Sequence, residues 1–212
     1  MSLIRDIRNS LFVKVNRNNE FSIMIKKEIF RKTIHISSAF IPYFFLFKPF
    51  ITMVLLLLVT MGYFLSEIMR INKINIPIIT NITELASRNR DEGKIVLGPV
   101  TLALGVFLAL MLFDYRIAVI AIFALSFGDG VASLYGKILG GVKIPFTFGK
   151  TLSGSLGCFF TLIFVFYSCN LSVKQAVILA LFSTGVEAFP TGDFDNLLIP
   201  VGVGLFCIYF LL

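Results

Sequence analysis

Seven long apolar segments dominate the chain and constrain its fold more than any other feature. Each is close to the about 20 residues that a helix needs to cross the hydrocarbon core of a bilayer. The mean hydropathy is +0.91 and 57% of the residues are hydrophobic, more than in a soluble domain of average composition. We therefore predict an all-α integral membrane protein with about seven transmembrane helices. The segments are 31–48, 50–69, 95–113, 116–135, 153–170, 174–191 and 196–212.

Residues 1–30 differ from the rest and are predicted to be a separate N-terminal segment. Their apolar residues recur at helical spacing, and basic residues occupy the remaining positions, which favours an amphipathic helix on the membrane surface. The alternative is a plain cytoplasmic tail. The segment lacks the apolar core and small-residue site of a cleaved signal. The apolar positions are Ile4, Ile7, Leu11 and Val15.

The basic residues predict the orientation of the chain. With the N-terminus in the cytoplasm and seven spans, 16 of the 19 Lys and Arg residues fall on the cytoplasmic side. The other side keeps only Lys48, Arg116 and Lys174. The positive-inside rule favours this arrangement, with the C-terminus outside. We expect a multi-pass protein of the cell (inner) membrane whose polar segments face the cytoplasm. The net charge of +7 then reflects membrane orientation rather than nucleic-acid binding.

The stretch 126–155, SFGDGVASLYGKILGGVKIPFTFGKTLSGS, is too polar for hydrocarbon. Charged groups and unpaired amides need a protein-lined, hydrated cavity. Asp129 is predicted to bind a cation or an ion partner, the alternative being a helix cap. Lys150, Thr151 and Ser155 supply a cation and hydroxyls at the start of the next segment, as a triphosphate requires. The stretch is not a P-loop, because position 144 is Ile144 rather than glycine.

Further polar residues border the other apolar segments. Glu67 and Arg70 share a helix face and are predicted to pair, and His35 is the single histidine. A routine ion pair and a packing histidine are the plain alternatives. Lys94, with Arg88 and Arg90, is a candidate for a positive wall of a triphosphate site, the alternative for the two arginines being charges that only orient the chain. The three cysteines fit no metal pattern.

The stretch 187–200, EAFPTGDFDNLLIP, contributes further acids. Its turn residues Asp193, Asp195 and Asn196 offer the oxygen ligands that magnesium prefers, although a solvated turn would look the same. Glu187 is a carboxylate at the end of an apolar segment, where an acid is expected to have an ion partner or a functional role.

Taken together, these motifs resemble the polyprenol kinase family of integral membrane enzymes, which includes dolichol kinases, phytol kinases and CTP-dependent diacylglycerol kinases. The resemblance covers residues 31–200. One position departs from the family pattern KTxEGS, because Ser153 stands where the acid is usual. The ordered motifs are RKTIH, ExxR, GKIVLGP, GDGVASLYGK, GKTLSGS and ExFxxxDxDNLLIP.

The resemblance implies that residues 31–212 form a kinase domain that transfers the γ-phosphoryl group of a nucleoside triphosphate, CTP, to a membrane lipid alcohol with Mg²⁺. An oligomer is compatible with it. Glu187, Glu67 and His35 are the candidates for accepting the alcohol proton, and the sequence does not choose among them. The expected metal ligands are Asp129 together with Asp193 or Asp195, and Asn196 is expected to bind the metal or to orient a carboxylate. The expected nucleotide contacts are Arg70, Lys94, Gly128, Lys150, Thr151, Gly154 and Ser155.

Two other functions are compatible with parts of the pattern. The GDxxAS and KTxxGS elements also resemble phosphatidate cytidylyltransferases, which would make a CDP-lipid and release pyrophosphate. A small transporter is the non-enzymatic alternative. It predicts polar residues deep in the spans and on both sides of the membrane, whereas here the outer half is nearly free of charge.

Overall fold

The structure is a computed structural model that describes residues 21–74, 76–87, 93–147, 149–189, 191–192 and 194–210. No strand occurs in these ranges apart from an isolated bridge between Lys143 and Thr151, so the predicted all-α class is confirmed there. The helices are residues 21–37, η1 (Ser38–Phe40), α2 (Ile41–Phe47), α3 (Pro49–Ile71), α4 (Pro77–Ala86), α5 (Gly98–Leu112), α6 (Tyr115–Phe123), η3 (Ala124–Asp129), α7 (Gly130–Leu139), α8 (Leu152–Ser168), α9 (Val173–Ala188) and α10 (Asp195–Phe210).

Each of the seven apolar segments is helical over most of its length in the described residues. Two helices are long and apolar enough to cross a membrane by themselves, Pro49–Ile71 and Tyr115–Leu139. This is consistent with a membrane protein. The predicted amphipathic helix at residues 4–15, together with Arg88, Arg90 and Asp193, lies outside the described residues. The helix of residues 21–37 runs without a break across the predicted boundary at residue 30.

Local sequence explains where several helices begin and end. Pro49 and Pro77 are the first residues of α3 and α4, a position where the missing N–H has no intrahelical partner to lose. Ser172 and Gln175 form a capping box at the start of α9. Gly140 ends α7 with a φ of +63°, in the left-handed region that favours glycine.

The bundle is organised around the continuous helix α6–η3–α7. It packs against α5, α8, α9 and α10, and 67% of its most apolar window is buried. In α3, which packs on α2, α4 and α5 at the edge of the bundle, only 11% of that window is buried. Phe50 and Val59 on α3 are 80% and 65% exposed. Because so little of this apolar helix is covered by protein, its exposed face is suited to contact with lipid.

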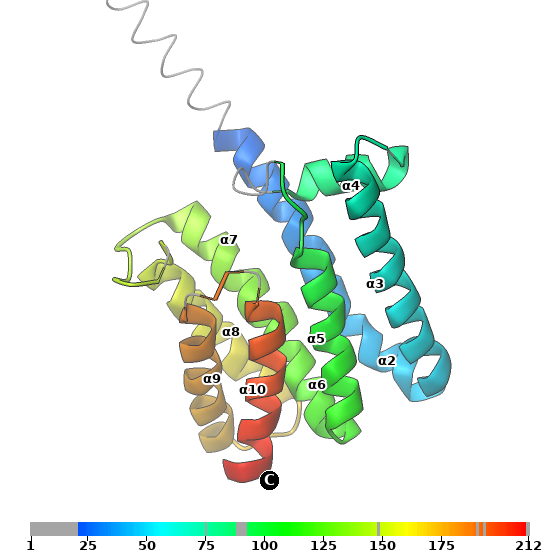
Figure 1. Cartoon of the computed structure of the whole chain (residues 1–212). Helices are drawn as coiled ribbons and strands as arrows, with labels where there is room; N and C mark the ends of the chain where they lie inside the picture. The colour runs from blue at the N-terminus through cyan, green and yellow to red at the C-terminus, as the bar shows by residue number, and fades with distance from the viewer. Residues whose placement is uncertain are drawn as a thin grey trace, which may run out of the picture.

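The two ends of the bundle differ (Figure 1). The turns α2–α3, α5–α6 and α8–α9 lie at one end, close to the end of α10. The helix α4, the end of α7 and the starts of α8 and α10 lie at the other end. The polar stretches of the sequence therefore gather on one side of an apolar body.

The six residues of η3, ALSFGD, form a π-helical segment in the middle of this central helix. Such wide turns occur frequently at functional sites, because they redirect side chains within an otherwise regular helix. Ser126 in this segment is fully buried, and its hydroxyl lies 2.6 Å from that of Ser38. Asp129 is the last residue of η3, so the wide turn leads directly to the buried acid.

Candidate functional site

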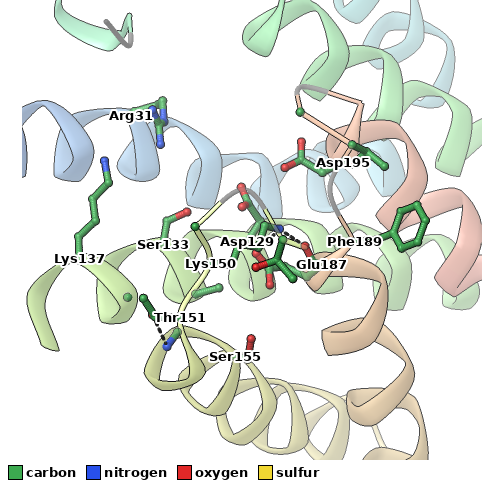
Figure 2. Close-up of a pocket in the computed structure, with 17 residues that line it drawn as sticks. Arg31, Asp129, Ser133, Lys137, Lys150, Thr151, Ser155, Glu187, Phe189 and Asp195 are labelled. Carbon is green, nitrogen blue, oxygen red and sulfur yellow. Dashed lines mark hydrogen bonds and ion pairs between the residues drawn. The ribbon is translucent and has the colours of Figure 1, made fainter. Parts of the chain in front are cut away.

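A polar pocket of about 340 Å³ opens where α7, α8, α9 and α10 meet the helix of residues 21–37 (Figure 2). It contains charges of both signs beside hydroxyls and glycines. Asp129, Lys150 and Asp195 reach it from three separate segments, as the sequence predicted for a common cavity. The lining residues include Arg31, Asp129, Ser133, Lys137, Thr147, Lys150, Thr151, Gly154, Ser155, Glu187, Phe189, Thr191 and Asp195.

The N-terminus of α8 forms one wall of the pocket. Thr151 caps this helix, because its hydroxyl accepts a hydrogen bond from the Gly154 N–H at 3.2 Å. The hydroxyl oxygens of Ser155 and Thr191 are buried and have no hydrogen-bond partner among the described residues. Phosphate oxygens accept hydrogen bonds from backbone amides at a helix N-terminus and from nearby hydroxyls. This wall is suited to an anionic ligand.

Two glycines allow α8 to approach α7 closely. A Cβ atom at Gly154 would lie 2.6 Å from the carbonyl oxygen of Ala132, and one at Gly136 would lie 2.8 Å from the Thr151 hydroxyl. Both distances are shorter than real contacts of a Cβ atom, so these positions require glycine unless the helices separate. The close contact brings the start of α8 next to the helix that follows Asp129.

Asp129 is buried, with 5% of its surface exposed. Lys32 donates a hydrogen bond to its Oδ2 atom, and His35 Nε2 lies 3.2 Å from the same oxygen. The Lys32 side chain is only 2% exposed. A buried ammonium and a buried carboxylate are each costly alone, and their pairing offsets much of that cost. The cation partner predicted for Asp129 is thus present within the protein.

Asn196 supports this network from α10. Its Oδ1 atom lies 2.8 Å from His35 Nε2. Its amide nitrogen donates to the carbonyl of Gly98 at 3.2 Å and to the hydroxyl of Thr101 at 3.0 Å. Asn196 is absent from the described lining of the pocket. Asn196 therefore orients His35 and ties α10 to α5.

Lys150 and Glu187 form a pair inside the pocket. Lys150 Nζ lies 2.7 Å from Glu187 Oε1 and also contacts the backbone carbonyl of Glu187. The Lys150 side chain is 26% exposed, whereas that of Glu187 is 5% exposed. The pair connects the segment before α8 to the end of α9. An anion that binds Lys150 would compete directly with this carboxylate.

Glu28 holds two cations at another side of the pocket. Arg31 lies 2.5 Å from Glu28 Oε1, and Lys137 donates to Oε2. Burial alone would raise the pKa of Glu28, but Arg31, Lys137 and Lys32 together hold that pKa below its ordinary value of 4.5. The carboxylate is therefore charged at neutral pH and neutralises part of the charge of two pocket-lining cations.

The structure does not bring Glu67, Arg70 and Lys94 to this pocket. Glu67, which is 1% exposed, accepts two hydrogen bonds from Arg70 at 2.9 and 2.8 Å. It also accepts one from the backbone N–H of Val96 at 2.9 Å, while Arg70 donates to the Lys94 carbonyl at 2.8 Å. Glu67 and Arg70 thus fix the backbone that leads into α5. The predicted helix pairing of these two residues is present.

Gly128 also lies away from the described lining. A Cβ atom there would lie 3.2 Å from Leu162 Cδ1, so this glycine permits packing of η3 against α8. Of the predicted metal ligands, Asp129 and Asp195 line the pocket. No group of three or more His, Cys, Asp or Glu side chains suited to a metal ion occurs in the part of the chain that the structure describes. Mg²⁺ in nucleotide sites takes only one or two carboxylates, with phosphate and water as its other ligands, so this donor set fits that mode.

Reasoning from the sequence assigned no role to Glu28, Lys32 or Lys137. A signal for the first two was present. Glu28, Lys32 and His35 are spaced by four and three residues, so on a helix they occupy one face. Three ionisable residues on one face of a helix beside apolar spans indicate a buried polar seam. Lys137 had no such signal, because its partner is 109 residues away in the chain.

Comparison with known proteins finds three informative relatives. Uncharacterized protein MJ1137 of Methanocaldococcus jannaschii is 31% identical over 147 residues, which are 66% of this chain and 72% of the relative. Probable phytol kinase 1, chloroplastic, of rice (Oryza sativa subsp. japonica) is 24% identical over 142 residues, which are 58% of this chain and 45% of the rice protein. Probable phytol kinase, chloroplastic, of wheat (Triticum aestivum) is 23% identical over 214 residues, covering 86% of this chain and 67% of the wheat protein.

The chain therefore spans less than half the length of the rice relative. No family model matches the chain, and no solved structure matches it.

Proposed function

The chain belongs to the same family as the Methanocaldococcus jannaschii protein, and because two plant relatives are named as phytol kinases, we propose that it is a membrane-bound kinase of a lipid alcohol. The observation that carries the proposal is the pocket itself. It combines the N-terminus of α8, the Lys150 cation and the carboxylates Asp129, Glu187 and Asp195 at one end of an apolar bundle. Phosphoryl transfer requires mainly such positioning and charge neutralisation.

In the proposed reaction, CTP donates its γ-phosphoryl group to the hydroxyl of a polyprenol, a phytol-like alcohol or a diacylglycerol. The alcohol oxygen forms a bond to the γ-phosphorus, the bond from that phosphorus to the β-phosphate bridging oxygen breaks, and CDP leaves. The amides at the start of α8 and the hydroxyls of Thr151 and Ser155 bind phosphate oxygens. Lys150 neutralises their charge.

The pairing of Lys150 with Glu187 suggests which group accepts the alcohol proton. A phosphate that binds Lys150 competes with Glu187 for the ammonium, so nucleotide binding releases the carboxylate. Glu187 then takes the proton of the attacking alcohol. Asp129, held by Lys32 and His35, and Asp195 would hold Mg²⁺ together with phosphate oxygens. When bound, the metal would neutralise charge on the transferring phosphoryl group.

The proposed topology has seven spans, a cytoplasmic N-terminus and a pocket that opens to the cytoplasm, where nucleotides are abundant. Its support is the bias of Lys and Arg residues to one side of the apolar segments. The lipid would enter sideways from the bilayer, with its hydroxyl at the polar end of the bundle. Cysteine-accessibility labelling of single residues in the turns α2–α3 and α8–α9 tests this orientation.

The activity is tested with purified protein in nanodiscs, labelled CTP or ATP, and phytol, a short polyprenol or diacylglycerol, each with Mg²⁺ and with EDTA. Labelled lipid phosphate is the expected product. Asp129→Asn and Lys150→Ala are expected to lower turnover about 10²-fold or more, the size of effect seen when one charge-stabilising group is removed. Lys174→Ala removes an exposed cation elsewhere and serves as the control.

Absence of transfer to all three alcohols from both nucleotides would refute the kinase function. Unchanged turnover in Asp129→Asn and Lys150→Ala would refute the assigned site. Release of pyrophosphate with formation of a CDP-lipid would instead identify a cytidylyltransferase.

A further inference from the structure

Two cations that line the pocket share one buried carboxylate. We call Glu28, Arg31 and Lys137 the Glu28 clamp. Arg31 is one helical turn after Glu28 in the helix of residues 21–37, whereas Lys137 comes from the last turn of α7. The Glu28 side chain is 1% exposed, and those of Arg31 and Lys137 are 20% and 36% exposed. The acid is therefore enclosed, while both cations keep contact with the pocket.

The charge balance of the clamp is positive. Glu28, Arg31 and Lys137 themselves carry one negative and two positive charges. The lysine ammonium has three N–H donors, and Glu28 supplies a single carboxylate to two cations. The clamp therefore presents positive charge in a fixed place without the cost of leaving Glu28 unpaired.

The clamp and the start of α8 lie on different sides of the same pocket. In Figure 2, the guanidinium of Arg31 and the ammonium of Lys137 lie away from Thr151 and Ser155, although Lys137 follows Gly136, which packs against Thr151. A ligand that contacts both sides must be extended and must carry several negative charges. A polyphosphate chain has this property, whereas a single carboxylate does not.

We propose that the Glu28 clamp is a phosphate-binding part of the nucleotide site, and that it contacts the polyphosphate chain on the side away from the start of α8. This inference rests on the proposed function and adds to it a role for three residues outside the sequence-predicted set. Arg31 and Lys137 bind phosphate oxygens. Glu28 is a positioning residue that acts through these two cations.

The test measures binding of tripolyphosphate and the KM for the nucleotide in nanodiscs of zwitterionic lipid. Arg31→Gln and Lys137→Gln are each expected to raise both the Kd and the KM about tenfold, since one charge-assisted hydrogen bond is removed, with kcat little changed. Lys26→Gln removes an exposed cation from the same helix and is expected to alter neither value. Binding unchanged in both Arg31→Gln and Lys137→Gln overturns the proposal.

Glu28→Gln separates positioning from simple electrostatics. It removes a negative charge, so electrostatics alone predicts tighter binding of tripolyphosphate. Positioning predicts weaker binding, because both cations lose their charged anchor. Tighter binding would overturn the role of Glu28. If Glu28→Gln does not fold, Lys137→Gln still decides the proposal, because its side chain is partly exposed.

Further arms separate this proposal from the proposed function and from a lipid ligand. If the protein lacks kinase activity but binds tripolyphosphate through Arg31 and Lys137, the proposed function fails and the phosphate site stands. If the protein is an active kinase and both substitutions leave the KM for the nucleotide unchanged, the proposed role of the Glu28 clamp is wrong and the proposed function stands. If only added anionic phospholipid responds to the two substitutions, the site takes a lipid headgroup and the proposal is overturned.

Discussion

The pair of Lys32 and Asp129 gives the sharpest prediction about stability. Lys32→Met removes the ammonium and leaves the carboxylate of Asp129 buried, with His35 Nε2 3.2 Å from its Oδ2 atom. Both side chains of the native pair are nearly enclosed, at 2% and 7% exposure. Removing one partner of a buried ion pair costs about 3–5 kcal/mol. For a chain of this size, that corresponds to a loss of about 10 °C in Tm.

The double variant Lys32→Met, Asp129→Leu is expected to recover most of that loss, because replacing a whole buried pair by apolar residues is often nearly neutral. Its kinase activity is expected to fall as far as that of Asp129→Asn, since the acid that lines the pocket is gone. The combination of restored stability and lost activity distinguishes a functional acid from a structural one.

Thermal unfolding in detergent can be followed with a thiol-reactive dye. The chain has no tryptophan, but it has three free cysteines, of which Cys158 and Cys207 are buried and become reactive on unfolding. If the double variant is as unstable as Lys32→Met alone, or if Lys32→Met retains the native Tm, the reasoning about the buried pair is wrong.

Two further predictions concern packing and pH. Gly154→Ala is expected to lower the free energy of unfolding by about 1–3 kcal/mol, because its Cβ atom would lie 2.6 Å from the Ala132 carbonyl oxygen. The control in the same thermal assay is Gly185→Ala, whose Cβ atom would meet no atom within 4 Å. Equal Tm values for the two variants would contradict the close contact. The pKa of Glu28 is held below its ordinary value of 4.5, so its contribution to stability is present above that value and is lost as pH falls through the lowered pKa. An acid titration of Tm is thus expected to be flatter for Glu28→Gln than for the native protein, and identical slopes would exclude a stabilising role for the charge.

Much of the candidate site could be predicted from residue type and order. An acid in GDGVAS and a lysine in GKTLSGS are expensive inside apolar surroundings, so their presence alone indicates a polar cavity. The structure brings Asp129, Lys150, Glu187 and Asp195 to one pocket. Local pairing was also predictable, since Glu67 and Arg70 are three residues apart on one helix.

Other parts could not be predicted, because they depend on which helix faces contact each other. Lys94 has the right charge for a nucleotide site, but it does not line the described pocket. Its backbone carbonyl instead accepts a hydrogen bond from Arg70. Asn196 has a suitable oxygen for a metal, yet that oxygen lies 2.8 Å from His35 Nε2. In both cases the residue type indicated a group that binds nucleotide or metal. Helix packing instead gave the Lys94 backbone and the Asn196 side chain contacts within the protein.

The sequence by itself determined the apolar helical class and the clustering of polar residues at particular helix ends, because hydrophobicity and charge cost act residue by residue along the chain. Only the tertiary structure decided that Lys32 neutralises Asp129 and that Glu28 joins Arg31 to Lys137. The physical reason is that these partners lie 97 and 109 residues apart. Such pairs depend on close helix approaches, for which glycines such as Gly136 and Gly154 provide room.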